Sequence, residues 1–170
     1  MWKILPFCLV VFAMGCIGVI LRRDLCRRRR ELGNFLLGLR IMETEMRYKA
    51  SSLEKCFACA ASGTEGEMKR VFQNTAERLR SGAVTADPFR ECLDETADCL
   101  SLTEEDRRCF GGFCERLGTA DMKSTLKDLR CTLARCEKAY AEAERNEQKW
   151  GGVFLKGGWL CGIAVALFFL

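Results

Sequence analysis

Two apolar runs occupy the ends of the chain, and the stretch between them is rich in charge. The first run, Ile4 to Leu21, has no charged residue in 18 positions, so as an α-helix it would be about 27 Å long. The second run, residues 151–170, holds a single charge at Lys156 and would be about 30 Å long as a helix. The hydrocarbon core of a bilayer is roughly 30 Å thick. Each run is therefore predicted to span a membrane once.

Both runs have a competing interpretation. A cleaved signal peptide also contains an apolar segment, but its positive charge precedes that segment; here Lys3 alone precedes it and "RRDLCRRRR" follows. For the second run the alternative is a buried core helix, because only 14 residues, Gly157 to Leu170, are free of charge. Trp150 and Lys149 suit a membrane interface, and Lys156 has a stem long enough to reach it. These features favour a span.

Between the runs, apolar residues recur with the 3.6-residue period of amphipathic helices, and no stretch alternates as a strand does. One stripe covers positions 32–46, shorter ones lie at 53–60, 68–79, 89–100 and 109–117, and the last steps by four and three residues from Met122 to Tyr140. None of these helices is apolar all round, so each must bury its stripe against others. We predict an all-α fold: a cytoplasmic bundle of about six helices flanked by N- and C-terminal transmembrane helices.

Several residue patterns predict where these helices begin and end. Ser51 and Thr64 each precede a glutamate by three residues, which is the spacing of a capping box. Pro88 fits the first turn of a helix, where its missing N–H costs nothing. Gly82 is a stop signal for the helix before it. Gly151–Gly152 and Gly157–Gly158 are expected to interrupt the last helix where it meets the second apolar run.

The charges orient the predicted spans. Six arginines follow the first run directly and place that side in the cytoplasm by the positive-inside rule; we call them the basic collar: Arg22, Arg23, Arg27, Arg28, Arg29 and Arg30. The resulting division is a first span (1–21), the collar (22–30), a cytoplasmic body (31–149) and a second span (151–170). The body carries 19 basic and 22 acidic residues, which argues against nucleic-acid binding. The collar either contacts anionic lipid, at about 1 kcal/mol for each charge, or serves only as a topology signal.

The side chains for catalysis or metal binding are scarce. The chain has no histidine, the commonest general base and metal ligand. Most of its twelve cysteines would face the reducing cytoplasm, where disulfides do not persist. We interpret those on apolar stripes as small hydrophobic residues: Cys92, Cys109, Cys114 and Cys136. Cys56 and Cys59 have the spacing of a redox or zinc half-site, but no second pair completes it. No catalytic, cofactor-binding or metal-binding residue is expected, and a cysteine-dependent redox or metal-binding membrane protein is the alternative.

Two segments resemble a known family. "LRIMETEMRYKASSLEK" contains an acid-rich helix pattern followed by a leucine and an acid: Glu43, Glu45, Met46, Tyr48, Leu53 and Glu54. "LGTADMKSTLKDL" contains an LGxxD pattern ahead of a long helix: Leu117, Gly118 and Asp121. With these motifs, the two terminal apolar runs and the total length, the chain resembles the stage III sporulation protein AB family of endospore-forming bacteria. The many cysteines and the unusually basic collar depart from the family pattern.

The resemblance implies a protein without enzymatic activity. The family's cytoplasmic domain is similar to the F-type platform proteins of type II secretion and type IV pilus systems. The resemblance implies that this domain links a secretion-type ATPase, similar to stage III sporulation protein AA, to the channel between mother cell and forespore. The resemblance thus implies a position in the outer forespore membrane with the body facing the mother cell. Expected partners are that ATPase, other channel components and the membrane; self-association stays open.

The exposed charges of the first helix are the candidate partner surface. Glu43, Glu45 and Arg47 lie within the acid-rich pattern that carries the resemblance. We expect them to contact a partner protein. The alternative is an ordinary solvated helix face.

Overall fold

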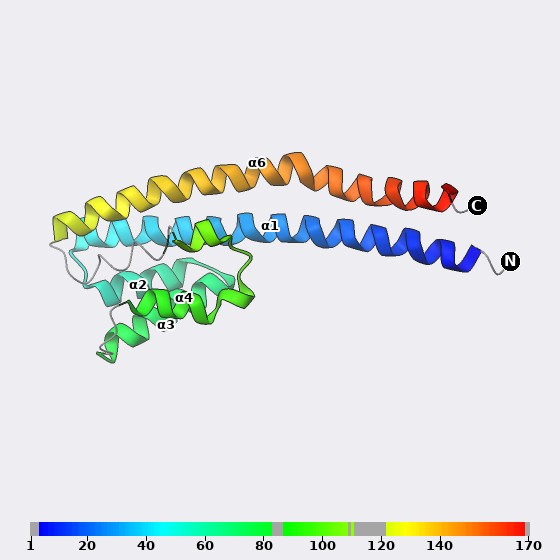
Figure 1. Ribbon diagram of the computed structural model, residues 1–170. Helices are drawn as coiled ribbons and strands as arrows, with labels where there is room; N and C mark the ends of the chain where they lie inside the picture. Colours follow the sequence, from blue (N-terminus) through cyan, green and yellow to red (C-terminus); the bar gives the residue numbers. More distant parts are fainter. Residues whose placement is uncertain (1–3, 83–86, 109, 111–121, 169–170) are drawn as a thin grey trace. The chain divides into compact units, whose positions relative to one another are not determined.

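The computed structural model describes the backbone of residues 4–82, 87–108, 110 and 122–168; the side chains of 4–12, 14, 122–123 and 154–168 lie outside the described part. Its elements are α1 (Ile4–Lys49), α2 (Leu53–Gly63), α3 (Gly66–Arg80), α4 (Pro88–Glu95), a 3₁₀ turn η1 (Ala97–Cys99) and α6 (Met122–Phe168) (Figure 1). A further helical stretch begins at Glu104. No strand occurs among the described residues. The predicted all-α fold with about six helices is confirmed.

The chain forms two compact units. The first contains Met1–Arg29 and Glu142–Leu170, and the second is the continuous segment Arg30–Ala141. Helices α1 and α6 contribute to both units, whereas α2, α3, α4 and η1 belong to the second. The boundaries predicted for the two spans, the collar and the body stay predictions.

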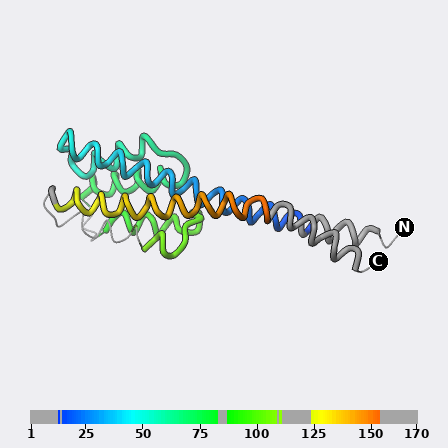
Figure 2. The backbone as a smooth tube through the Cα atoms, turned by 90° about the horizontal axis from the view of Figure 1, so that it is seen from above, coloured from blue at the N-terminus to red at the C-terminus, as the bar shows by residue number. Residues whose placement is uncertain are grey.

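In the second unit, α1 lies between α6 on one side and the α2–α4 layer on the other (Figure 1). Figure 2 shows the same unit from above, with the α1 stretch in cyan beside the α6 stretch in yellow. Two ion pairs join these helices: Arg40 Nη2 to Glu137 Oε1 at 2.9 Å, and Arg130 Nε to Glu43 Oε1 at 2.7 Å. Both lie on the surface, so they fix the relative register of the helices more than they add stability.

A cluster of phenylalanines forms the core of the second unit. Each comes from a different helix and is at most 1% exposed: Phe35, Phe57, Phe72, Phe89 and Phe110. Phe35 stacks on Phe72 with ring centroids 6.0 Å apart, and Phe110 lies 3.9 Å from Phe35. Gly38 makes room for this cluster, because a Cβ there would overlap the ring of Phe72. Large buried rings dominate the hydrophobic energy of a small domain, so this cluster holds the α2–α4 layer against α1.

The predicted capping boxes are wrong, although the helices they were meant to start exist. Ser52, not Ser51, is the N-cap of α2, and Ser51 Oγ instead donates a hydrogen bond to Glu45 Oε2 at 3.3 Å. Thr64 is the C-cap of α2, and its hydroxyl donates to the Ala60 carbonyl at 2.9 Å. In both cases the hydroxyl donates its hydrogen bond to a nearby acceptor outside the expected first turn of the helix. The spacing to a glutamate three residues on therefore predicted the wrong cap.

Other predicted boundaries are confirmed. Pro88 is the first residue of α4, behind the N-cap Asp87, whose side chain accepts from Arg90 N at 3.0 Å. Gly82 follows the end of α3 with a φ of +67°, the left-handed conformation that glycine tolerates best. The residues of the LGxxD pattern, Leu117, Gly118 and Asp121, lie outside the described residues.

Helix α6 runs unbroken from Met122 to Phe168. The expectation that the glycine pairs interrupt it is therefore wrong for the backbone. Within its predicted seam, Leu129, Leu133 and Cys136 are buried, whereas Leu126 and Tyr140 are half-buried. The buried face continues to Ala143, which is 2% exposed.

None of the helices, as far as the structure describes them, contains a segment long and apolar enough to cross a membrane. Most side chains of the two predicted spans, 4–12, 14 and 154–170, lie outside the described part. The spans therefore stay predictions.

Candidate partner-binding surface

The structure places Glu43, Glu45 and Arg47 near the C-terminal end of α1 but gives them different surroundings. Glu43 is engaged across the bundle, because its Oε1 accepts from Arg130 Nε of α6 at 2.7 Å. Its side chain keeps 26% of its surface exposed. A partner that bound Glu43 would have to compete with this ion pair or share the carboxylate with Arg130.

Glu45 is largely buried and stabilises the turn that joins α1 to α2. Its carboxylate accepts hydrogen bonds from Lys49 Nζ at 2.6 Å and from Ser51 Oγ at 3.3 Å. The hydrogen bond from Lys49 holds the pKa of Glu45 below its usual value, and the same bond raises the pKa of Lys49. These contacts give Glu45 a structural role at the turn, independent of any partner.

Arg47 is exposed, and its guanidinium lies 5.3 Å from the ring centroid of Tyr48. Tyr48 is 74% exposed, so this cation–π contact is open to solvent on its other side. No carboxylate among the described residues is within ion-pair distance of Arg47. Of the three predicted partner residues, Arg47 is thus the one that presents an uncompensated charge outward.

The basic collar is divided between the two units. In the first unit, Arg29 pairs with Glu147 at 2.9 Å and with Glu144 at 3.7 Å. Cys26 donates to the other oxygen of Glu147 at 3.3 Å, and partial burial followed by this carboxylate raises the pKa of the Cys26 thiol. The side chains of Arg22, Arg23 and Arg27 are exposed, and that of Arg28 is half-buried.

Arg30, the last collar residue, belongs to the second unit. It is exposed and forms an ion pair with Glu65 at 3.2 Å. The collar arginines Arg29 and Arg30 thus both point toward carboxylates of the chain itself.

The cysteine pair of α2 does not have the environment of a redox site. Cys56 is fully buried, and burial, together with the nearby charge of Glu45, raises the pKa of its thiol to about 11. Reactive cysteines have a lowered pKa and an accessible sulfur. Cys92 and Cys136 are buried as predicted, while Cys109 and Cys114 lie outside the described residues. Within the described part, no three potential ligands gather around a metal position.

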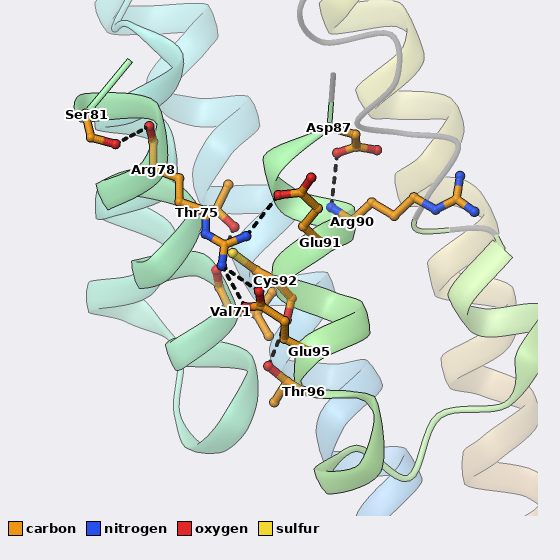
Figure 3. Close-up of polar contacts among 10 residues, drawn as sticks. All are labelled: Val71, Thr75, Arg78, Ser81, Asp87, Arg90, Glu91, Cys92, Glu95 and Thr96. Atoms are coloured by element: carbon orange, nitrogen blue, oxygen red, sulfur yellow. Dashed lines mark hydrogen bonds and ion pairs between the residues drawn. The ribbon is translucent and has the colours of Figure 1, made fainter. Parts of the chain in front are cut away.

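A cluster between α3 and α4 was not anticipated from the sequence. Arg78 of α3 reaches both oxygens of Glu95, at 2.7 and 2.8 Å, and Glu91 at 3.1 Å (Figure 3). The hydrogen bonds from Arg78 to Glu95 are the main cause of the raised pKa of the Arg78 guanidinium. The i,i+4 spacing of Glu91 and Glu95 was the available signal, since it places two acids on one face of a helix.

Glu31 is the second residue that sequence reasoning missed. It is 7% exposed, and its Oε2 accepts from the backbone N–H of Ser101 at 2.6 Å. The bond connects α1 to the segment after η1, 70 positions away. Glu31 precedes the buried Phe35 and Leu39 by four and eight residues, so the three residues share one face of α1. This spacing was the sequence signal that Glu31 would be a buried acid.

A groove runs between α1 and α6 in the second unit. Gly33 lets the ring of Tyr140 approach α1, since a Cβ there would lie 3.2 Å from Tyr140 Cε2. Arg40 and Glu137, which pair with each other, also line this groove. The volume of the groove is about 340 Å³, and its lining residues are Gly33, Leu36, Leu37, Arg40, Glu137 and Tyr140.

These features define an all-α bundle protein whose candidate site, within the described residues, is a helix surface beside a groove. The comparisons with known proteins identify the family. A model of the family described as stage III sporulation protein AB matches residues 3–170, and the chain belongs to that family. It is 24% identical over 168 residues to stage III sporulation protein AB of Bacillus subtilis (strain 168), with 98% of each chain covered.

A solved structure of stage III sporulation protein AB has the same fold. The TM-score is 0.66 at 22% sequence identity, and the match covers 72% of this chain and 98% of the solved one. The predicted resemblance is confirmed, and membership of the family supports a role in sporulation.

Proposed function

We propose that this protein is a membrane platform without enzymatic activity. In this role it couples a cytoplasmic secretion-type ATPase, similar to stage III sporulation protein AA, to the membrane part of the channel between mother cell and forespore. The observation that carries the proposal is the family match over residues 3–170, which includes the body and both terminal runs.

The proposed anchor consists of one membrane span at each end of the chain. Both α1 and α6 are continuous helices that extend from a terminal apolar run into the polar second unit. The positive-inside rule places the second unit in the mother-cell cytoplasm and both chain ends on the other side of the outer forespore membrane. The exposed arginines at positions 22, 23 and 27 then face the lipid headgroups.

The contacts within the second unit suit a part that transmits displacement. The Phe35-centred cluster joins α1 to the α2–α4 layer, and the pairs Arg40–Glu137 and Glu43–Arg130 join α1 to α6. A load on the body would reach both helices together, because well-packed cores deform little. The proposed partner contacts are made from the exposed end of α1, with Arg47 as the residue best placed for them.

Co-purification tests the coupling. The full chain, solubilised in mild detergent from sporulating cells of its host, is expected to bring down the AA-like ATPase. If the wild-type chain is recovered intact with the other channel components and the ATPase is absent, the coupling role is wrong.

A further inference from the structure

Two large hydrophobic side chains of the second unit stand out by their exposure. Among the described residues of that unit, Leu37 at 44% and Tyr48 at 74% are the exposed large hydrophobics. They are eleven residues apart on α1, which is three helical turns and about 16 Å. Residues at this spacing share one face of a helix. That face also holds Arg40, Thr44 and Arg47, all exposed, and we call the five residues the α1 strip: Leu37, Arg40, Thr44, Arg47 and Tyr48.

The groove lies at one end of the α1 strip. Leu37 and Arg40 belong to both, and Tyr140 of α6 forms the opposite wall. Gly33, which has no side chain, lines the groove and leaves space there. An apolar side chain entering beside Leu37 would therefore be covered by leucine and tyrosine surface, which is the usual setting of a binding anchor.

The charge of the strip has one sign. Its two ionisable residues other than Tyr48 are arginines, whereas the neighbouring acids of α1 are turned into internal contacts: Glu43 pairs with Arg130 and Glu45 with Lys49. Arg40 shares its charge with Glu137, and Arg47 has only the Tyr48 ring within the described residues. Arg47 is therefore the uncompensated charge of the strip, and a ligand with negative charge opposite Arg47 matches it.

We propose that the α1 strip binds an acidic amphipathic helix of a partner protein. One apolar side chain of that helix enters the groove beside Leu37, a second one three turns along packs on Tyr48, and carboxylates between them pair with Arg47 and Arg40. A helix is the occupant that fits, because two anchors three turns apart repeat the period of a helix lying along α1. This inference rests on the proposed function, since it describes the partner side of the platform.

The inference replaces part of the predicted partner surface. Arg47 remains, while Glu43 and Glu45 give way to Leu37, Arg40 and Tyr48. The sequence pattern of acids attracts attention to the same end of α1, but the contacts show that the acids are already used.

Site-specific photo-cross-linking tests the inference. The full chain is expressed in sporulating host cells with p-benzoylphenylalanine at position 48 or at position 37, and with the same probe at position 74, on the exposed face of α3, as a control. Cross-linked peptides are then identified by mass spectrometry. We expect positions 37 and 48 to cross-link to one helical segment with a net negative charge, at a yield at least tenfold above that at position 74.

The charge requirement is tested in the same chain. Arg47→Glu is expected to reduce the cross-link at position 48 at least tenfold, and Arg47→Lys is expected to keep most of it. Because Arg47 makes no ion pair in the described part of the chain, neither substitution should lower the unfolding midpoint of the protein. Cross-links to lipid, to a second copy of this chain or to a basic segment overturn the inference, and so does a yield no higher than the control.

The outcomes distinguish this inference from the proposed function. If the ATPase co-purifies with the wild-type chain but the cross-links do not reach an acidic helix, only the strip is wrong. If the cross-links reach an acidic helix while the ATPase fails to co-purify, the strip stands and the coupling role is wrong.

Discussion

Glycines in α1 determine how closely its neighbours can approach. A Cβ at Gly38 would overlap the ring of Phe72, which is fully buried within the phenylalanine cluster. Among the described residues, a Cβ at Gly33 would meet Tyr140, at 3.2 Å from its Cε2 atom. That ring is half-buried and lines the groove, which leaves it space to move. Replacement by alanine should therefore have a much larger effect on stability at Gly38 than at Gly33, one and a half turns away.

Gly38→Ala is expected to lower the free energy of unfolding by about 1–3 kcal/mol, because overpacking forces the ring out of its place. Gly33→Ala, the matched control, should change it by less than about 0.5 kcal/mol, since the gain in helix propensity offsets a small movement of Tyr140. Urea unfolding of the full chain in detergent, followed by circular dichroism, measures both. Equal effects would mean that Phe72 does not pack against Gly38.

The buried thiol of Cys56 predicts how stability depends on pH. Its pKa is raised to about 11 from the ordinary value of 9.0, so between these values the unfolded chain has lost the proton while the folded chain keeps it. The free energy of unfolding therefore falls as the pH rises from about 9 toward 11. Cys56→Ala should make this decline shallower, and Cys99→Ala, at an exposed position, controls for cysteine removal. Identical pH slopes in the wild type and Cys56→Ala would contradict the burial of the thiol.

Among the helices, amphipathic stripes were predictable and their end contacts were not. The stripe of α1 is buried as its period indicates, at Leu32, Phe35, Leu39 and Met42. Ser51 and Thr64 have the spacing of caps, yet their hydroxyls bond to Glu45 and to the Ala60 carbonyl. The period of the apolar residues predicts which side chains are buried, because every turn of the helix repeats the signal. A cap depends on one hydrogen bond, and the sequence does not show which acceptor lies nearest.

The candidate site was predictable to the correct end of α1 but not to the correct residues. Glu43 looks solvent-facing in the sequence because its partner is not local: Arg130 lies 87 positions away, on α6. The partners of Glu45, Lys49 and Ser51, are close in sequence, but the turn after α1 that buries its carboxylate could not be read from the residue pattern. For Leu37 the sequence suggests burial instead of exposure, since an apolar residue next to a buried stripe is expected to be covered. Only the three-dimensional arrangement of α1 and α6 shows that it is exposed at a groove.

The seam of α6 provides a test of packing between elements. Leu129 is fully buried, so Leu129→Ala should lower the free energy of unfolding by about 2–5 kcal/mol through lost burial and the cavity that remains. Leu37→Ala, with the same change in side chain at an exposed position, should cost less than about 0.5 kcal/mol. Chemical unfolding of both variants under identical conditions gives the comparison. A cost below about 0.5 kcal/mol at Leu129 would mean that this face of α6 is not packed.

For the chain as a whole, function follows from how a polar unit is joined to two apolar ends. The second unit holds the phenylalanine core, the groove and the α1 strip, and α1 and α6 extend from it as unbroken helices. The family identity supports a role in sporulation, and the proposed orientation places the second unit where an ATPase of the mother cell can reach it. The orientation can be tested on the chain's own cysteines.

Cys99 and Cys131 are exposed in the second unit, whereas Cys56 and Cys92 are buried and would label slowly on either side of a membrane. A membrane-impermeant maleimide is expected to label Cys99 and Cys131 only after the cells are permeabilised, because the second unit faces the cytoplasm. Mass spectrometry of the isolated chain identifies the labelled positions. Labelling of either cysteine in intact cells would contradict the proposed topology and place the second unit on the other side of the membrane.

Recruitment of the ATPase to a membrane by this chain is the central claim, and reconstitution tests it most directly. The full chain is placed in vesicles containing anionic lipid, and the purified AA-like ATPase is added before flotation through a density gradient. The ATPase is predicted to float with vesicles that contain the wild-type chain and to remain at the bottom with empty vesicles. If the ATPase remains at the bottom although the chain is inserted, folded and accessible to the maleimide, the platform role is contradicted.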